Sequence, residues 1–185
     1  MEQATETEVQ RLLPCVSVQR RGQALRYKHL FGQFCCLKSW TMLSRLLSER
    51  PVIDYGNWEY NEYGKPHFPQ NLSPITHHPC FFSISHCKEG IAVAIDDRPI
   101  GIDIEAIRHA DPELIARTMS TEEQLVIKDD RDFTRLWTRK EAVVKYLGTG
   151  IEGFEQLQDI LSKYPDVEIE TVEREKYIYS IAYKS

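Results

Sequence analysis

The sequence lacks the features that mark several large functional classes. It has no phosphate-binding P-loop, no glycine-rich dinucleotide fingerprint between a strand and a helix, and no protein-kinase motif set. No apolar run reaches the roughly 18 residues of a membrane-spanning helix. The net charge is −5, so there is no basic excess of the kind that attracts nucleic acid. We therefore expect neither a common nucleotide-binding cradle, nor a membrane span, nor a nucleic-acid partner.

What is present is the composition of an ordinary globular protein. The 185 residues suit one domain, or two small halves that share a core. The hydrophobic share of 42 % is typical of soluble proteins. The five cysteines are an odd number, and no signal-peptide pattern accompanies them. These two features predict reduced thiols and a cytoplasmic location.

A short alternating stretch carries the clearest chemical signal. Between Pro99 and Glu105, isoleucines alternate with Gly101, Asp103 and Glu105. A period of two predicts a strand with the isoleucines in a core and both carboxylates on the other face, roughly 6 to 7 Å apart. Two such carboxylates can bind one hard cation, and Gly101 would leave the backbone open to a ligand. The alternative is an ordinary edge strand with a solvated polar face.

The residues before this stretch predict a hairpin. Two β-rich runs, 81–87 and 91–95, flank a turn at Gly90. With the strand at 99–105 they would form a three-stranded antiparallel meander. Ser85 and His86 lie at the end of the first run, where polar side chains can reach a ligand.

Two cationic segments precede the hairpin. Residues 25–47 have few helix breakers and apolar side chains near helical spacing, which predicts one long amphipathic helix. In the turn Gly64-Lys65-Pro66, proline excludes a helix and holds Lys65 extended. A stiff turn can direct the ammonium at an anion, or it can be only a turn.

A second helix is predicted from about Asp132 to a stop at Gly148. Trp137, Glu141 and Lys145 are spaced by four and share one face. Glu141 and Lys145 can form a simple intrahelical ion pair. Alternatively, Glu141 adds a third carboxylate to Asp103 and Glu105, and Lys145 meets negative charge. Lys140 lies about 100° round the helix and could approach the same site from its edge.

Two further segments complete the chain. Ser120 and Glu123 match a helix capping box, which by itself explains both residues. The runs 167–172 and 177–183 resemble strands that would close the sheet of the second half. Taken alone, the carboxylates and lysines predict a magnesium-dependent phosphoryl-type transferase or phosphohydrolase.

Four motifs occur in a fixed order along the chain: Gly64-Lys65-Pro66, Phe82-Ser83-Ile84-Ser85-His86, Gly101-Ile102-Asp103-Ile104-Glu105 and Trp137-x-x-Lys140-Glu141-Ala142-x-x-Lys145-x-x-Gly148-x-Gly150. Together they resemble the motifs of the 4′-phosphopantetheinyl transferases. The order is similar to the monomeric, pseudo-dimeric Sfp type, because the first two motifs precede the Asp-x-Glu strand. The chain departs from that type in its shorter length, in Ser83 where asparagine is frequent, and in Cys87 where serine is.

The resemblance implies a fold and an activity. The fold would be α+β, with two similar helix-plus-antiparallel-sheet halves related by a pseudo-twofold. These would be residues 1–98, which contact coenzyme A, and residues 99–185, which carry the magnesium and catalytic residues. The enzyme would move the 4′-phosphopantetheine group from coenzyme A to a serine of an apo acyl or peptidyl carrier protein and release 3′,5′-ADP. It would require Mg²⁺ and act as a monomer.

The resemblance also assigns roles residue by residue. Asp103, Glu105 and Glu141 would hold magnesium, with Glu141 also counted as catalytic. Glu123 would take the proton of the attacking serine, unless it is only a helix cap. Lys145 would steady or protonate the leaving phosphate. Coenzyme A would be bound by Lys65, Ser85, His86, Asp103, Lys140 and Lys145, and by either Lys38 or Arg45 of the first helix.

Two other classes of function stay open at this point. A coenzyme A or nucleotide pyrophosphohydrolase would use water in place of the serine. A non-catalytic module would bind coenzyme A or a carrier protein without turnover. Nothing in the residues indicates which carrier or pathway is served.

Overall fold

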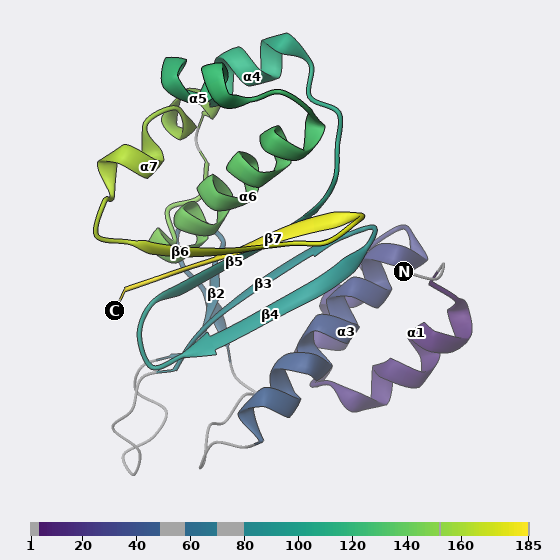
Figure 1. Cartoon of the computed structure of the whole chain (residues 1–185). Helices are drawn as coiled ribbons and strands as arrows, with labels where there is room; N and C mark the ends of the chain where they lie inside the picture. The colour runs from purple at the N-terminus through teal and green to yellow at the C-terminus, as the bar shows by residue number, and fades with distance from the viewer. Residues whose placement is uncertain (1–3, 49–57, 70–79, 152, 185) are drawn as a thin grey trace. The chain divides into compact units, whose positions relative to one another are not determined.

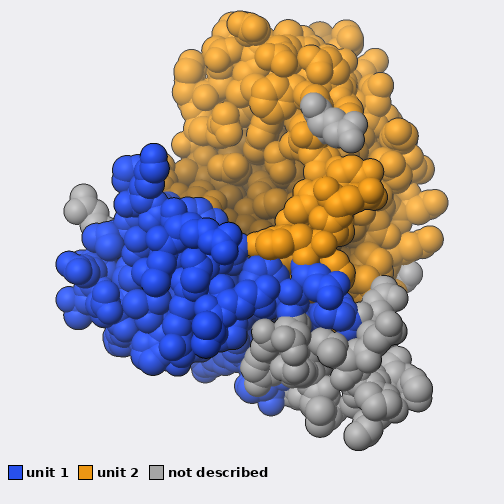
Figure 2. All heavy atoms as spheres, turned by 180° about the vertical axis from the view of Figure 1, so that it is seen from behind, with its two compact units in different colours: residues 1–59, 68–79 blue, residues 60–67, 80–185 orange. Residues whose placement is uncertain are grey.

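The computed structural model describes residues 4–48, 58–69, 80–151 and 153–184. Its contacts group the chain into two compact units, which are coloured separately in Figure 2. The first unit comprises residues 1–59 and 68–79, and the second comprises residues 60–67 and 80–185. No helix in the described residues has both the length and the apolar character needed to cross a membrane.

The first unit is helical. Helices α1 and α2 pack against the longer α3, whose inner face buries Leu37, Trp40 and Leu43 (Figure 1). The bounds are α1 (Glu6–Leu12), the 3₁₀ turn η1 (Leu13–Cys15), α2 (Val18–Ala24) and α3 (Leu30–Leu47). Lys38 and Arg45 both lie on α3, half-buried and exposed respectively, so the choice between them as coenzyme A contacts stays open.

The predicted helix over 25–47 is wrong for its first five residues. Leu25 ends α2, and His29 adopts an extended conformation that starts α3. The chain between them folds back, so that the ring of Tyr27 would lie 2.9 Å from a Cβ built on Gly32. Gln33 also donates a hydrogen bond to the Tyr27 carbonyl at 2.9 Å. Gly32, which lies within the predicted helix, makes room for the preceding turn because it has no side chain.

Two larger antiparallel sheets lie among the described residues of the second unit (Figure 1). β3 (Phe81–Cys87) and β4 (Gly90–Asp96) form the predicted hairpin, with Ser85 opposite Ala92. The other sheet has the order β5-β7-β6, built from β5 (Ile100–Ala106), β6 (Glu168–Glu173) and β7 (Tyr177–Tyr183). The two C-terminal strands lie where the sequence predicts them, and the α+β fold class is confirmed.

The predicted three-stranded meander is wrong, because β5 pairs with β7 and not with β4. β5 does lie beside β3, but side chains and not a backbone ladder join the two strands. The hydroxyl of Ser83 accepts from the Ile102 amide at 3.0 Å, and that of Ser85 accepts from the Ile104 amide at 3.3 Å. Serine oxygens thus satisfy β5 amides that would otherwise be buried without a partner.

β5 lies at the edge of its sheet, but it is buried on both faces and has no solvated side. Helix α6 (Asp130–Leu147) covers the face that carries Gly101 and Asp103. A Cβ on Gly101 would lie 2.0 Å from the Ala142 carbonyl oxygen of that helix. The prediction that Gly101 exposes backbone to a ligand is therefore wrong. Glycine is needed there because the α6 backbone occupies the space of a side chain.

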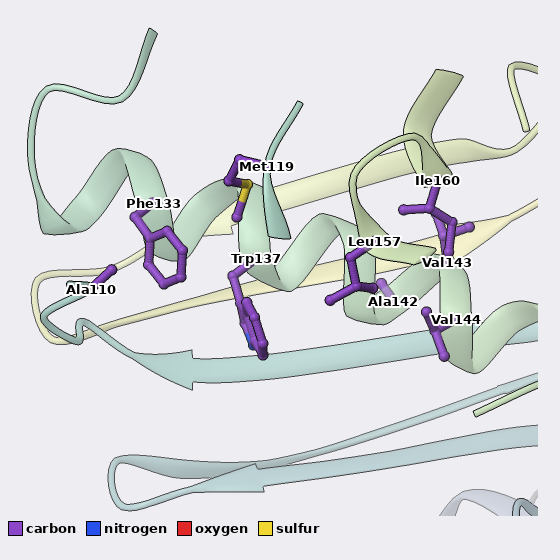
Figure 3. Packing of buried hydrophobic residues seen from close by; sticks show 10 residues of the cluster. Ala110, Met119, Phe133, Trp137, Ala142, Val143, Val144, Leu157 and Ile160 are labelled. Carbon is purple, nitrogen blue, oxygen red and sulfur yellow. The ribbon is translucent and has the colours of Figure 1, made fainter. Parts of the chain in front are cut away.

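Helix α6 begins and ends as its sequence predicts. Asp129 caps it by accepting from the Arg131 and Asp132 amides, and Gly148 ends it with a φ of 73°. Its apolar side forms a core with Met119, Leu157 and Ile160, in which Phe133, Trp137 and Val143 are buried (Figure 3). The surrounding short helices are α4 (Pro112–Thr118), α5 (Thr121–Val126), η2 (Phe154–Leu157) and α7 (Ile160–Lys163).

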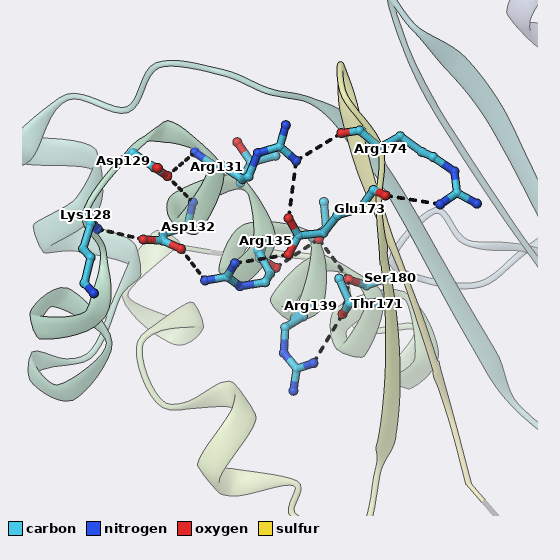
Figure 4. Close-up of polar contacts among 12 residues, drawn as sticks. Lys128, Asp129, Arg131, Asp132, Arg135, Arg139, Thr171, Glu173, Arg174 and Ser180 are labelled. Atoms are coloured by element: carbon cyan, nitrogen blue, oxygen red, sulfur yellow. Dashed lines mark hydrogen bonds and ion pairs between the residues drawn. The ribbon is translucent and has the colours of Figure 1, made fainter.

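Polar contacts fasten the first half of α6 to the sheet (Figure 4). Arg131 and Arg135 both pair with Glu173 of β6, at 3.3 and 3.1 Å. Deeper in, the buried hydroxyl of Ser180 lies 2.9 Å from that of Thr138 and 3.0 Å from that of Thr171. The exposed ion pairs contribute little individually, whereas the buried hydroxyls fix the position of the helix over the sheet.

The compact units differ in their boundary from the predicted halves 1–98 and 99–185. β3 and β4 pack with β5, which places residues 80–98 in the second unit. The short strands β1 (Glu59–Tyr60) and β2 (Pro66–His67) form a two-stranded sheet around the turn that contains Lys65. The predicted halves describe an internal duplication, which contact grouping does not test, so the division at residue 98 stays a prediction.

Candidate active site

Asp103 is the most constrained carboxylate of the second unit. It lies on β5 with 3 % of its surface exposed. Its Oδ1 accepts from the Lys145 ammonium at 2.7 Å and from the Ser85 hydroxyl at 2.8 Å. Its Oδ2 is buried without a hydrogen-bond partner among the described residues. A buried carboxylate oxygen without a partner is costly, so this atom is available to a cation or another donor.

Glu105 and Glu141 interact electrostatically with Asp103. Burial, followed by the charge of Asp103, raises the pKa of Glu105. The same two causes raise the pKa of Glu141 to about 7, and the charge of Glu105 adds to the effect. Arg108 and Lys145 act in the opposite direction on both groups. Three carboxylates that destabilise one another's charge form a site that a cation would relieve.

This donor set fits magnesium in chemistry, although it is not arranged as a finished metal site. Magnesium prefers carboxylate oxygens and usually binds through only one or two of them, together with phosphate oxygens. Asp103 Oδ2, which has no partner among the described residues, matches that preference, as do Glu105 and Glu141, whose charges are disfavoured by Asp103. No cluster of three or more acidic, histidine or cysteine side chains within the described ranges is already arranged to hold a metal. Asp103, Glu105 and Glu141 are the residues that would hold one.

A cavity of about 370 Å³ lies beside these groups. Its charged lining consists of Glu141 and the two lysines Lys65 and Lys145. The rest of the lining is formed by Tyr63, Gly64, Pro66, Phe82, Ser83, Ile84, Val144, Gly148, Gly150 and Ile151. A mostly apolar cavity with a few converging charges is typical of a small-molecule binding site.

Lys65 contributes to the wall of this cavity in an unexpected manner. Its ammonium donates to the carbonyl oxygen of Ile100 at 3.2 Å and to that of Lys145. Burial and the charge of Lys145 lower the pKa of Lys65 to about 8. The stiff turn does hold the ammonium in a defined place, next to the end of α6, where carbonyl groups favour a cation.

The structure separates Ser85 from His86. They follow one another on β3, so their side chains point to opposite faces. Ser85 is buried and bonded to Asp103, whereas His86 is exposed. Ser85 therefore contacts a predicted metal ligand, which the sequence did not indicate, and neither residue lines the cavity.

Lys140 is not brought to this site. Its side chain is fully buried, and its ammonium lies 2.6 Å from Glu123 Oε2. It also donates to the carbonyl oxygens of Leu157 at 2.6 Å and Gln158 at 3.1 Å. An ammonium has three donors, and these partners use all of them. In this structure no donor of Lys140 remains for a phosphate, so its contact with coenzyme A stays a prediction.

Glu123 forms the capping box that its spacing predicts. Its Oε2 accepts from the Ser120 amide at 2.8 Å, and its own amide donates to the Ser120 hydroxyl at 3.3 Å. The same Oε2 meets Lys140, which joins the short helix α5 to α6. Sequence spacing could not reveal the contact with Lys140, which lies 17 residues further along the chain.

Sequence reasoning missed two contributors to the site. Arg108 lowers the pKa of both glutamates, and its guanidinium lies 5.0 Å above the Trp137 ring. Asn61 connects the turn that contains Lys65 to the end of α6. The available signals were weak: an arginine three residues after Glu105, and an asparagine at the start of a glycine-containing turn.

Comparisons with known proteins agree with this geometry. Residues 99–185 match the family described as the 4′-phosphopantetheinyl transferase superfamily. The chain is 30 % identical over 152 residues to 4′-phosphopantetheinyl transferase psf-1 of Bacillus pumilus, which covers 78 % of this chain and 63 % of that protein. It is 29 % identical over 155 residues to 4′-phosphopantetheinyl transferase Sfp of Bacillus subtilis, covering 80 % and 66 % of the two chains.

A third relative matches a shorter region at a higher identity. The 4′-phosphopantetheinyl transferase AcpT of Salmonella typhi is 36 % identical over 116 residues, covering 58 % of this chain and 55 % of its own. The chain thus spans between about half and two thirds of the length of these curated relatives. The family predicted from the four motifs is confirmed for the second part of the chain: residues 99–185 belong to the 4′-phosphopantetheinyl transferase superfamily.

Proposed function

We propose that this protein transfers the 4′-phosphopantetheine group of coenzyme A to a serine of an apo acyl or peptidyl carrier protein. The observation that carries the proposal is the buried Asp103, bonded to Lys145 and left with one unpartnered oxygen beside a cavity that two lysines line. The names of the three relatives support the same activity.

The reaction exchanges the phosphoanhydride bond of coenzyme A for a phosphodiester bond to the carrier serine. The serine oxygen attacks the β-phosphorus of the coenzyme A pyrophosphate, and a new serine–phosphorus bond forms. The bond from that phosphorus to the bridging oxygen breaks, and 3′,5′-ADP leaves with the electron pair. Bound Mg²⁺ would supply neutralisation of the pyrophosphate charge. We propose that Lys145, whose side chain is 28 % exposed, stabilises the leaving phosphate.

Glu123 is our proposed acceptor for the serine proton. Its Oε2 is occupied by the Ser120 amide and Lys140, which hold the carboxylate in one orientation. Its Oε1 has no hydrogen-bond partner among the described residues. The cap and the base are therefore compatible roles, one for each oxygen. Lys140 acts in this scheme as a positioning residue.

The remaining assignments follow from the resemblance. We propose that Lys65 and Lys145 meet the phosphates of coenzyme A, and that His86 and one of Lys38 and Arg45 contribute further contacts. Ser85 donates a hydrogen bond to Asp103 Oδ1, and we propose that it orients this carboxylate. We further propose that the protein works as a monomer in the cytoplasm, with Mg²⁺ held by Asp103, Glu105 and Glu141.

An intact-mass assay tests the activity directly. The protein is mixed with coenzyme A, Mg²⁺ and a purified apo acyl carrier protein, and the carrier is weighed with and without EDTA. We expect a magnesium-dependent gain of one phosphopantetheinyl group. Consumption of coenzyme A without a gain on any of a panel of carriers would contradict the transferase and indicate a pyrophosphohydrolase. Binding of coenzyme A with no turnover would indicate a binding module.

A further inference from the structure

Asn61 organises the turn that carries Lys65. Its side-chain Oδ1 accepts from the Tyr63 amide at 3.0 Å and from the Lys65 amide at 2.8 Å. Its backbone adds two bonds, because its amide donates to the Lys65 carbonyl and its carbonyl accepts from the Gly64 amide, both at 3.0 Å. Gly64 takes a φ of 82°, which a glycine adopts without strain. Four hydrogen bonds to one residue give the turn a single shape.

The other side of the same amide joins this turn to helix α6. Asn61 Nδ2 donates to the Gly148 carbonyl at 2.7 Å. That carbonyl belongs to the residue that ends α6, where carbonyls lack a partner within the helix. Lys65 adds a second link by donating to the Lys145 carbonyl. A Cβ on Gly148 would lie 3.3 Å from both Asn61 Nδ2 and Lys65 Cδ, so the glycine allows this close approach.

These contacts set the shape of the cavity. Residues 63–66 form one part of its wall, and Glu141, Lys145 and Gly148 of the α6 side form another. Within the part of the chain that the structure describes, Asn61 is the residue whose side chain bonds both parts through separate atoms. The position of Lys65 relative to Lys145 therefore depends on it.

We propose that Asn61 is a positioning residue for coenzyme A binding, which holds the Gly64-Lys65-Pro66 turn against the end of α6 and so fixes the two cavity lysines relative to each other. The assignment rests on the proposed function for the identity of the ligand. Asn61 itself does not line the cavity, so its effect is exerted through Lys65.

The bonding pattern explains why asparagine is required. One end of the side chain must accept from two amides, and the other must donate to a carbonyl. Aspartate can accept but cannot donate, and it would bring a negative charge against the Gly148 carbonyl. Alanine can do neither. Asn61→Asp therefore keeps the turn and removes its link to α6, whereas Asn61→Ala weakens both.

The experiment compares Asn61→Asp and Asn61→Ala with a control, Glu62→Gln, at an exposed residue of the same turn. Coenzyme A binding is measured by calorimetry, and KM and kcat by the carrier-mass assay. We expect both Asn61 variants to raise Kd and KM for coenzyme A about tenfold, with kcat at saturation changed less than about threefold, since misplacement of a binding group weakens binding in this range. The control should match the wild type.

A second readout does not depend on transfer. Reductive methylation with ¹³C-formaldehyde reports the titration of lysines by NMR, and Lys65→Arg identifies the Lys65 signal. In the wild type this signal should titrate near the value of about 8 that burial imposes. In both Asn61 variants it should move upward, because the ammonium gains solvent.

The outcomes separate the inference from the proposed function. Folded Asn61→Asp protein with wild-type Kd and an unchanged Lys65 titration would overturn the positioning role. Failure of the wild type to bind coenzyme A would overturn the proposed function, while the Lys65 titration would still decide whether Asn61 holds the turn. If Asn61→Ala does not fold, Asn61→Asp decides, because it retains the acceptors of the turn.

Discussion

Helix α6 carries two lysines that each form an ion pair with a carboxylate. The two N–O distances are nearly equal, but the surroundings of the pairs differ. Lys140 lies 2.6 Å from Glu123, and Lys145, five residues later, lies 2.7 Å from Asp103. The two remaining donors of the Lys140 ammonium bond to backbone carbonyls, and the side chain is fully buried. The Lys145 side chain is 28 % exposed, and one oxygen of Asp103 has no hydrogen-bond partner among the described residues.

The difference shows how adjacent parts of one motif divide their roles. A buried cation whose donors are all used can stabilise the fold, but it has nothing left for a substrate. An ion pair beside a cavity that keeps free donors or acceptors is less stable by itself and can bind a ligand. The Lys140 pair joins α5 to α6, whereas Lys145 lines the cavity, where we propose that its pair contributes to the site. The following predictions concern these two pairs and the residues in contact with them.

The largest effect is expected at Asp103. Asp103→Asn keeps an oxygen that can accept from Ser85 and Lys145, and it removes the charge that would hold a metal. We expect carrier modification to fall about a thousandfold, because several kcal/mol of charge stabilisation in the transition state are lost. The thermal midpoint should change by only a few degrees.

The carrier-mass assay with a parallel melt checks this prediction. Calorimetric titration with Mg²⁺ in the presence of coenzyme A serves as the control, since binding should weaken together with turnover. A folded Asp103→Asn protein that modifies the carrier at a rate near that of the wild type would remove Asp103 from the site.

The next effect is expected at Glu123. Glu123→Gln retains an acceptor for the Ser120 amide but removes the charge opposite Lys140 and the ability to take a proton. We expect kcat to fall about a hundredfold, as for loss of a general base, together with a lower midpoint in urea. Quenched-flow kinetics with the purified carrier measure kcat, and a urea melt measures the midpoint. A wild-type kcat with reduced stability would leave Glu123 as a cap only.

Much of this comparison could be predicted from the sequence, because it rests on local patterns. The spacing of Ser120 and Glu123 predicts the capping box, and alternation predicts β5. Composition and periodicity also predict the bounds of α6 to within two residues. These features depend on neighbours in the chain, and the patterns that describe them have a period of two or of about four residues.

What the sequence could not provide depends on contacts between distant segments. Lys140 and Lys145 have the same chemistry, and helical spacing alone placed Lys140 near the site edge. In the structure the Lys140 ammonium donates to the carbonyls of Leu157 and Gln158, which lie in a segment without a local signal. Gly101 likewise could be interpreted only once α6 was seen against it, since a missing side chain does not indicate what fills the space.

A smaller effect is expected when Ser85 is changed. Ser85→Ala removes the donor to Asp103 Oδ1 and the acceptor for the Ile104 amide. Groups that orient a metal ligand typically affect binding by about tenfold or more. We expect the apparent affinity for Mg²⁺ in the carrier assay to weaken about tenfold, with kcat at saturating Mg²⁺ largely kept. Equal Mg²⁺ dependence in Ser85→Ala and wild type would show that Ser85 does not orient Asp103.

The smallest effect is a pH dependence of stability. Burial and Asp103 raise the pKa of Glu141 from 4.5 to about 7, so the folded protein binds more protons than the unfolded chain between these values. The free energy of unfolding therefore falls as pH rises from about 4.5 to about 7 in metal-free protein. In Glu141→Gln this contribution disappears.

Urea melts of the two proteins in EDTA, from about pH 5 to about pH 8, measure the difference. The wild type should lose stability relative to the variant as pH rises through this window. A difference that stays constant with pH would mean that Glu141 is not forced into its neutral form by its surroundings.

The most direct test of the division between the two pairs is a side-by-side measurement of Lys140→Met and Lys145→Met. Each protein is assayed for carrier modification by intact mass and for its free energy of unfolding in urea. We expect Lys140→Met to lose about 3 to 5 kcal/mol of stability, because Glu123 and two carbonyls lose a buried partner. We expect Lys145→Met to keep most of its stability and to lose carrier modification at least a hundredfold. Equal losses of stability in the two variants, or full activity in folded Lys145→Met, would contradict the account.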